Sequence, residues 1–231
     1  MTQEQLRKRF EGREEARVVM EAGTHSPWAS RLLKECGHEV IVANPRKLRM
    51  IYESDDKHDP QDAEMLGRLG RVDPQLLCPI QHRGAEAQAD LALLRARDAL
   101  VKARSQLINH VRGAIKAVGY RIDRSSSESF HKKAAGQVPP ELRAALTPVI
   151  ETIGKLTEQI RGQDAQVEQM GEKKYPETQR LRQVAGVGPL TSLAYVLTIE
   201  DPKRFKKSRE VGPYLGGPEI ERRTDALSAW P

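Results

Sequence analysis

Three carboxylates in the first third of the chain have the residue type and spacing needed to hold divalent cations. Glu21 ends a β-prone run, and Asp59 and Asp62 lie three residues apart on either side of Pro60. Proline suits the first turn of a helix, so Asp59 would be the N-cap and Asp62 would lie one turn further on the same face. Such oxygen ligands bind Mg²⁺, which can position an attacking hydroxyl and stabilise the leaving oxygen in phosphodiester cleavage. The alternative is ordinary helix chemistry, in which acids at the first turn stabilise a helix start.

The elements around these acids are predicted to form a strand–helix–strand unit. The run 17–21 is the first strand, a helix opens with Ser26 as its N-cap, and the run 39–42 is the second strand. A helix between two short buried strands implies parallel pairing and a right-handed crossover. Parallel sheets bind their ligands at the carboxyl ends of the strands, where Glu21 lies. Residues 1–82 are therefore predicted to be an α/β region.

The middle of the chain, residues 84–172, is predicted to be helical. Apolar pairs repeat every seven residues from Leu93 to Ile115. A second series advances in steps of four and three, through Leu142, Leu146, Val149, Ile153, Leu156, Ile160, Val167 and Met170. Such a heptad pattern indicates a seam between helices. It fits an antiparallel coiled-coil hairpin or a dimerising coiled coil, and we expect a homo-oligomer formed through it.

The third region, residues 176–216, is predicted to be a small all-α part with features that suit nucleic acid. Gly186 and Gly188 precede an apolar helix, in a helix-hairpin-helix-like turn whose backbone amides could meet a phosphate. The alternative is a plain turn between packed helices. Two groups of basic residues could also contact phosphate, although a solvated helix face is the alternative. These residues are Arg95, Arg97, Lys102, Arg104, Arg112, Lys203, Arg204, Lys206, Lys207 and Arg209.

The composition excludes several classes of protein. The 38 Lys and Arg against 32 Asp and Glu give a net charge of +6, a modest indication of a polyanionic partner. Two cysteines are too few for a disulfide scaffold, and no apolar run is long enough for a membrane span. Cys36-x-His38 and Cys78-x-x-x-His82 have spacings that do not suit known zinc ribbons or fingers. We expect a cytoplasmic protein with no membrane partner.

Several motifs together resemble the DEDD transposases of the IS-one-ten, or Piv/MooV-like, insertion-sequence family. The resemblance runs in the family's order over roughly residues 5–216, and only the combination is specific. The matching segments are Val18–Thr24, Gly37–Val40, Val42–Lys47, Lys57-x-Asp59-x-x-Asp62-Ala63, Gly186–Thr191, Asp201-Pro202-x-Arg204-Phe205 and Tyr214–Gly216. The resemblance implies DNA binding, DNA transposition and site-specific recombination.

The resemblance also implies a fold and a set of roles. An RNase H- or RuvC-like domain supplies four acids to Mg²⁺, a helical region follows, and a C-terminal domain supplies a serine nucleophile. Glu21 matches the second acid, and Asp59 and Asp62 match the third and fourth. DNA is the implied substrate, and several members are guided by an RNA made from the end of the element.

The sequence also departs from the family pattern. The first acid has no counterpart, and residues 217–231 form an aberrant tail of the kind a frameshift produces, so Ser228 is not given the nucleophile's role. We expect an incomplete RuvC-like sheet with uncovered apolar faces and an open edge. It should hold Mg²⁺ weakly, and the chain alone should neither cleave nor transpose DNA. The alternative is a non-catalytic coiled-coil protein that binds nucleic acid or dimerises.

Overall fold

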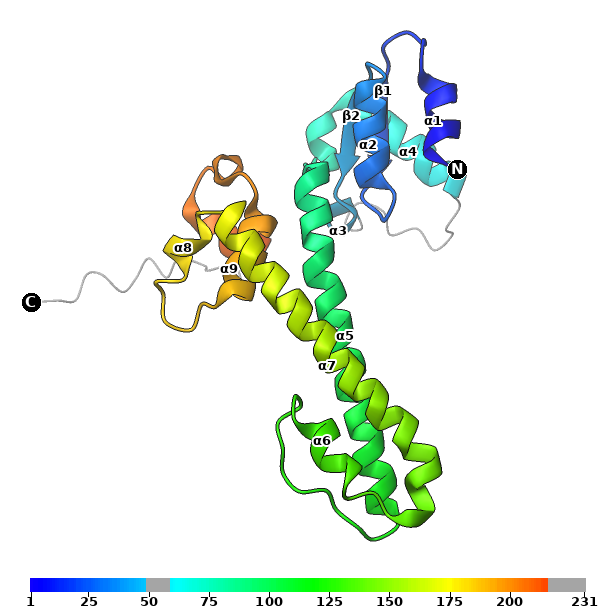
Figure 1. The fold of residues 1–231 in the computed structure, drawn as a ribbon. Helices are drawn as coiled ribbons and strands as arrows, with labels where there is room; N and C mark the ends of the chain where they lie inside the picture. Colours follow the sequence, from blue (N-terminus) through cyan, green and yellow to red (C-terminus); the bar gives the residue numbers. More distant parts are fainter. Residues whose placement is uncertain (49–58, 216–231) are drawn as a thin grey trace, which may run out of the picture. The chain divides into compact units, whose positions relative to one another are not determined.

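The computed structural model describes residues 1–48 and 59–215 (Figure 1). The chain divides into two compact units, and the division falls between Ala85 and Glu86. Helices make up most of the described residues, and the described strands are two. None of the helices in these ranges combines the length and the apolar character that a membrane crossing requires.

The first unit is built around a small parallel sheet. Its elements are α1 (Gln3–Phe10), β1 (Arg17–Glu21), α2 (Ser26–Glu35), β2 (Glu39–Ala43), α3 (Pro45–Leu48), α4 (Asp59–Val72) and the 3₁₀ helix η1 (Pro74–Leu77). The two strands pair in parallel, with Arg17 opposite Glu39 and Glu21 opposite Ala43. The predicted strand–helix–strand unit is therefore confirmed.

Both faces of the sheet are covered, contrary to the expectation of exposed apolar faces. Because side chains alternate along a strand, Val18 and Val40 face one side and Val19 and Ile41 face the other. The first side packs on Leu6 of α1 and on Trp28, Leu32 and Leu33 of α2. The second side packs on Leu66 and Leu69 of α4, with Leu48 and Leu77. Helices on both faces are the usual arrangement for parallel strands.

The α2 helix begins one residue earlier than predicted. Ser26 is the first helical residue, and His25 occupies the N-cap position without a side-chain cap bond. The Ser26 hydroxyl instead accepts a hydrogen bond from the Gly23 backbone N–H at 2.9 Å. It therefore stabilises the turn between β1 and α2 rather than the helix N-terminus.

The second unit contains two long helices and a group of short ones. Its elements are α5 (Ala85–Ala117), α6 (Phe130–Ala135), η2 (Pro140–Leu142), α7 (Arg143–Lys173), α8 (Thr178–Leu181), α9 (Pro189–Ile199), η3 (Pro202–Arg204), η4 (Ser208–Glu210) and α10 (Val211–Tyr214). One buried cluster joins Ile108 and Ile115 of α5 to Phe130 of α6 and Ile153 of α7. A second cluster joins α5 and α7 to Leu193 and Leu197 of α9.

The seam of α7 differs from the predicted one by a rotation about the helix axis. The residues buried on α7 are Leu146, Ile150, Ile153, Thr157, Ile160, Val167 and Gly171. The heptad spacing is the predicted one, but Ile150, Thr157 and Gly171 take the positions expected for Val149, Leu156 and Met170. The displaced apolar residues are half-buried beside the seam. Thr157 can be buried because its hydroxyl donates to the Ile153 carbonyl at 2.8 Å.

Polar side chains interrupt the seam of α5 at intervals of seven residues. The Asp90 carboxylate accepts a hydrogen bond from the Tyr175 hydroxyl at 2.5 Å and pairs with Lys174. Arg97 pairs with Asp164 at 2.5 Å, and Arg104 Nη1 lies 3.4 Å from the Thr157 hydroxyl. Because the partners come in reverse order along α7, the two helices are antiparallel.

Candidate active site and nucleic-acid interface

Glu21 and Asp62 are exposed carboxylates without an ion pair among the described residues. Glu21 is the last residue of β1, at the carboxyl end of a parallel strand. Asp62 lies in the first turn of α4, which begins at Asp59. The side chain of Asp59 lies outside the described part of the structure. Both described acids are therefore free to accept a cation.

The described residues do not bring these acids together in a formed metal cluster. Within residues 1–48 and 59–215, no three His, Cys, Asp or Glu side chains converge as a metal site would require. The oxygen chemistry of Glu21 and Asp62 fits a hard cation such as Mg²⁺. Two monodentate carboxylates supply only part of a six-coordinate shell, so water or substrate oxygens would have to complete it.

Ser26 and His82 form a contact beside the turn that follows Glu21. The Ser26 hydroxyl and His82 Nε2 are 2.8 Å apart, and the serine is buried. Burial lowers the pKa of His82, and the cations of Arg31, Arg83 and Lys34 lower it further. Sequence reasoning missed this pair because 56 residues separate the two side chains.

The zinc alternative for the two Cys/His pairs finds no support in the described residues. Both cysteines are half-buried free thiols. The buried His38 ring uses both nitrogens for the backbone, since Nδ1 accepts from the Ala16 N–H and Nε2 lies 3.1 Å from the Phe10 carbonyl. No lone pair remains on His38 for a metal.

The predicted basic residues of α5 occupy different environments. Arg95 and Arg112 are exposed, and the Arg112 guanidinium lies 5.2 Å from the centre of the Phe130 ring. Lys102 is exposed and pairs with Asp98, and Arg97 pairs with Asp164 across the seam. Arg104 is only 8% exposed. Its guanidinium faces Thr157 rather than solvent, and we leave it out of the proposed nucleic-acid surface.

The turn before α9 contains a left-handed backbone conformation at a glycine. Gly186 has φ +85°, a conformation that L side chains rarely adopt, and Gly188 is the N-cap of α9. Pro189 then occupies the first helical turn, where its missing N–H costs nothing. The turn is exposed at Gly186, and it joins α8 to α9.

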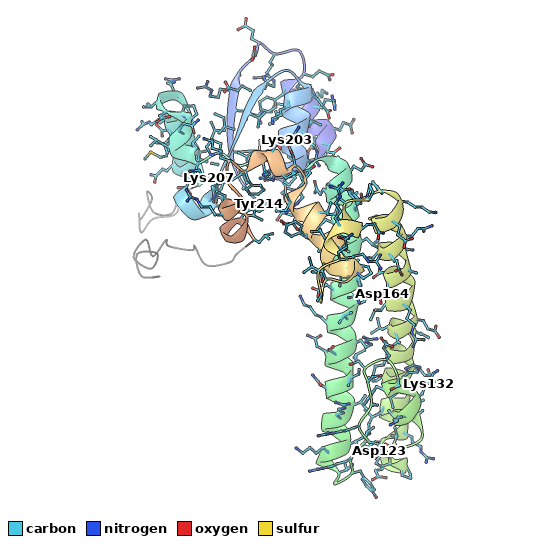
Figure 2. All side chains as sticks on the ribbon, turned by 90° about the vertical axis from the view of Figure 1, so that its left-hand side faces the viewer. Asp123, Lys132, Asp164, Lys203, Lys207 and Tyr214 are labelled. Atoms are coloured by element: carbon cyan, nitrogen blue, oxygen red, sulfur yellow. The ribbon has the colours of Figure 1, made fainter. Side chains whose placement is uncertain are left out.

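The basic run Lys203–Arg209 carries five cations around an aromatic pair. Phe205 and Tyr214 meet edge to face, with ring centres 5.2 Å apart. The Arg204 guanidinium lies 4.8 Å from the Tyr214 ring centre and 5.5 Å from that of Phe205. Figure 2 shows Lys203, Lys207 and Tyr214 at one end of the second unit, far from Asp123 and Lys132 at the other.

None of the five cations of this run makes a side-chain ion pair with the described residues. The contacts of Lys203 and Lys206 are made by their backbone N–H groups, to Asp201 and Glu210. Arg204 is held by aromatic faces, which leave the guanidinium N–H groups without an acceptor in the described chain. This arrangement presents unpaired positive charge, as a phosphate-binding surface does.

Comparison with known proteins decides the family. Residues 1–119, which are 119 of 231, match the profile of the DEDD_Tnp_IS110 transposases. The chain belongs to this transposase family. Residues 178–223 also match the profile described as "Transposase IS116/IS110/IS902 family". The family comprises transposases of insertion sequences, which act on DNA.

Curated relatives match this chain over most of its length. A "Probable family 20 transposase" of Pseudomonas aeruginosa is 28% identical over 86% of the chain and 60% of its own length. The "Transposase for insertion sequence element IS1111A" of Coxiella burnetii is 26% identical over 86% of the chain and 55% of its own length. The corresponding IS1328 transposase of Yersinia enterocolitica is 29% identical over 86% and 59%. The chain thus spans somewhat more than half the length of these relatives.

Proposed function

We propose that this protein is of the kind that transposes an insertion sequence by Mg²⁺-dependent strand cleavage and transfer, and that this chain on its own is inactive. In this proposal the first unit binds the metal through Glu21, Asp59 and Asp62. The second unit holds nucleic acid. The observation that carries the proposal is the free carboxylate of Glu21 at the end of β1, in a segment that matches the DEDD profile.

The packing of α4 supports a common location for the three acids. Near the end of α4, the Gly70 carbonyl accepts a hydrogen bond from Arg17 at the start of β1. Asp62 lies eight residues earlier, about 12 Å along a helix with a rise of 1.5 Å per residue. The start of α4 therefore points away from the start of β1, and we propose that it approaches the strand's carboxyl end, where Glu21 lies.

The proposed chemistry divides between the metal and the chain. When bound, Mg²⁺ would stabilise charge on the attacking and leaving oxygens of a phosphodiester. The carboxylates of Glu21, Asp59 and Asp62 would hold the cation and orient the phosphate against it. Ser26 and His82 would keep the turn after Glu21 in place.

Mn²⁺ binding tests the metal site, because Mn²⁺ accepts the oxygen ligands of a Mg²⁺ site and can be followed by electron paramagnetic resonance. Glu21→Gln and Asp62→Asn should each weaken binding about tenfold or more. Glu64→Gln is the matched control, since Glu64 is an exposed acid on the same helix that pairs with Arg68. Equal binding by all four proteins would contradict the proposed site.

The chain on its own is predicted not to cleave DNA, because the resemblance implies four acids and this sequence matches three of them. Incubation of a supercoiled plasmid with the chain and Mg²⁺ or Mn²⁺ should leave the plasmid intact. Nicking that Asp59→Ala abolishes would overturn this prediction of inactivity and would support the metal mechanism.

Three partners complete the proposal. DNA is the substrate, an RNA encoded by the element is a second nucleic-acid partner, and a second copy binds through the α5–α7 region.

The proposed nucleic-acid surface consists of Arg95, Arg97, Lys102, Arg112, Gly186, Gly188, Lys203, Arg204, Lys206, Lys207 and Arg209. Sedimentation of the chain with and without DNA tests the oligomeric state.

A non-catalytic nucleic-acid-binding protein is the second candidate function. The unpaired cations of Lys203–Arg209 favour it, because they need no carboxylate to act. DNA retardation that survives Asp59→Ala and falls steeply with salt, in a chain that binds no Mn²⁺, would select this function.

A further inference from the structure

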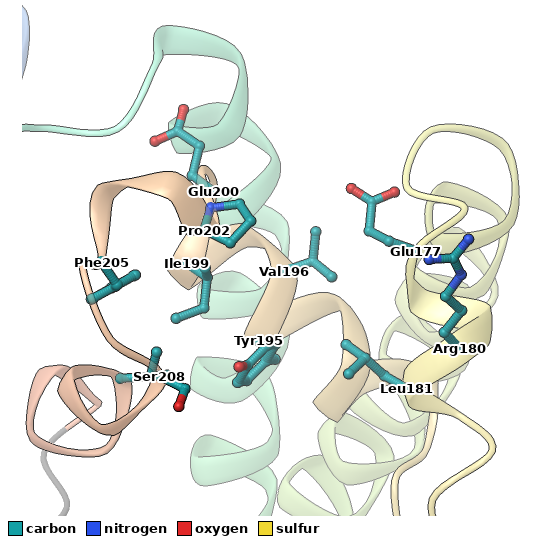
Figure 3. Close-up of a pocket in the computed structure, with 11 residues that line it drawn as sticks. Glu177, Arg180, Leu181, Tyr195, Val196, Ile199, Glu200, Pro202, Phe205 and Ser208 are labelled. Carbon is teal, nitrogen blue, oxygen red and sulfur yellow. The ribbon is translucent and has the colours of Figure 1, made fainter.

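A pocket of about 480 Å³ lies between α8, α9 and the segment that carries the basic run. Its walls are mainly apolar, with Leu181 from α8, Val196 and Ile199 from α9, and Val211 from α10. In Figure 3, Tyr195 lies between Ile199 and Leu181 along the pocket, and Phe205 stands at one end. The volume falls within the roughly 300–1,000 Å³ of pockets that bind small organic groups.

Two aromatic rings line this pocket, and one of them is open to solvent. Tyr195 is 39% exposed, although it lies on α9 among buried neighbours. Phe205 is half-buried and also contacts the Arg204 guanidinium. An exposed aromatic ring in an apolar pocket is the kind of surface on which a nucleobase stacks.

One cation lines the same pocket, and the basic run is continuous in sequence with two of its lining residues. Arg180 belongs to its lining and is exposed without an ion pair among the described residues. Phe205 and Ser208 of the lining flank Lys206 and Lys207 in the chain, and Arg209 follows Ser208. The two acids of the lining, Glu177 and Glu200, stand along the upper edge in Figure 3. Phosphates are therefore expected along the opposite edge, toward Ser208.

We propose that this pocket binds an unpaired nucleobase of a nucleic-acid strand, with Tyr195 as the stacking surface and the basic run as the contact to the flanking phosphates. The inference rests on the proposed function, because it names the form of nucleic acid that the second unit takes. A base in a duplex is already stacked and paired, so the pocket selects single-stranded or extruded nucleotides.

The experiment measures binding of the full chain to three labelled probes by fluorescence anisotropy. The probes are a twelve-nucleotide thymidine strand, the same strand with abasic sites in place of its bases, and a blunt duplex of twelve base pairs. Tyr195→Ala should weaken binding of the thymidine strand about tenfold, since a base–aromatic stack contributes about 1–3 kcal/mol. It should leave binding of the abasic strand and of the duplex unchanged.

Control variants distinguish the contribution of the Tyr195 ring to binding from the contribution of positive charge and from loss of folding. Tyr195→Phe keeps the ring and should keep the affinity for the thymidine strand. Lys206→Gln together with Lys207→Gln should weaken binding of all three probes by similar factors. Melting curves of each variant should coincide with the wild type, because the replaced side chains are exposed. A uridine strand of the same length distinguishes RNA from DNA as the source of the base.

The outcomes distinguish this inference from the proposed function. If the wild type binds the duplex but Tyr195→Ala weakens all probes equally or none of them, the base pocket is wrong and the nucleic-acid function stands. If Tyr195→Ala changes only the melting temperature, another protein segment occupies the pocket, which also overturns the inference. If the wild type binds no probe, the nucleic-acid function itself fails.

Discussion

The surroundings of His82 disfavour the protonated form of its imidazole. Burial and the cations of Arg31, Arg83 and Lys34 lower its pKa below the ordinary 6.5. Below pH 6.5 the unfolded chain therefore binds a proton that the folded chain resists, so stability falls as the pH falls through this window. Above pH 6.5 neither state binds this proton, so the penalty for protonating His82 no longer lowers the stability.

This linkage gives a residue-scale prediction. Between pH 7.5 and 5.5, the urea midpoint of the wild type should fall more than that of His82→Gln, which does not titrate. His110→Gln is the control, because His110 is exposed on α5. If the urea midpoints of the wild type and of His82→Gln fall equally between pH 7.5 and 5.5, His82 makes no contribution to the pH dependence of stability.

The positions of Glu21 at the end of a strand and of Asp62 in the first turn of a helix were predictable, but the contacts around them were not. Glu21 and Asp62 were found from residue type and from the strand or helix that carries each. The Ser26–His82 contact depends on how residues 78–84 return to α2, and no local pattern encodes that path. Burial of Arg104 was likewise missed, because a charged side chain in a heptad is expected on the solvated face.

Substitution of two glycines of α4 by alanine tests how this helix packs on the sheet. A Cβ on Gly70 would lie 2.4 Å from Val19 Cγ2, whereas a Cβ on Gly67 would meet nothing within 4 Å. Alanine favours a helix over glycine by about 1 kcal/mol, so Gly67→Ala should stabilise the first unit by about that amount. Gly70→Ala should destabilise it by about 1–3 kcal/mol, because Val19 is β-branched and cannot turn aside freely. Chemical denaturation measures both, and stabilisation by both variants would show that α4 does not approach β1 so closely.

Arg104 tests the seam between α5 and α7. Its guanidinium is buried against Thr157 with Nε unpaired and no carboxylate beside it among the described residues. Such a charge costs free energy, so Arg104→Met should raise the free energy of unfolding by about 1 kcal/mol or more. Arg95→Met, on the exposed face of the same helix, should change it little. A loss of stability in Arg104→Met alone would mean that the buried guanidinium makes stronger contacts than the one to Thr157.

The seam of α7 also shows which features of a helix its own sequence does not predict. Its heptad spacing follows from the sequence, but the rotation that buries Ile150, Thr157 and Gly171 depends on tertiary contacts. The Gly171 carbonyl accepts a hydrogen bond from the buried Thr178 hydroxyl at 2.9 Å, which brings α8 against α7. A Cβ on Gly171 would already be in van der Waals contact with Thr178, at 3.4 Å from its Oγ1, so a side chain larger than alanine would push these helices apart. Hydrophobicity alone predicted Met170 as the seam residue. It takes no account of the small side chain that the close approach of α8 requires at position 171.

At the scale of the whole molecule, the sequence predicted the order of an α/β part followed by helical parts. It did not predict that both sheet faces would be covered, because Leu66, Leu69 and Leu77 lie beyond the matched motifs of the first strands. It also did not show that residues of α9 share a core with α5 and α7, which makes them parts of one unit. Contacts between distant segments account for both differences.

Net charge is only +6, so the distribution of cations rather than their total should govern binding to nucleic acid. The unpaired run at 203–209 concentrates five cations within seven residues. Each phosphate contact contributes a slope of about −0.9 to the logarithm of the duplex binding constant against the logarithm of salt concentration. Replacing Lys203, Lys206, Lys207 and Arg209 by Gln should therefore weaken duplex binding and make the slope shallower by about 2–4. A control with the same loss of charge at exposed residues nearer the far end of α5 and α7, Lys116, Arg121, Lys132 and Lys155, should keep the wild-type slope. The slope counts the phosphates that a surface neutralises, so the reverse result would show that the far ends of α5 and α7, and not the basic run, contact the duplex phosphates.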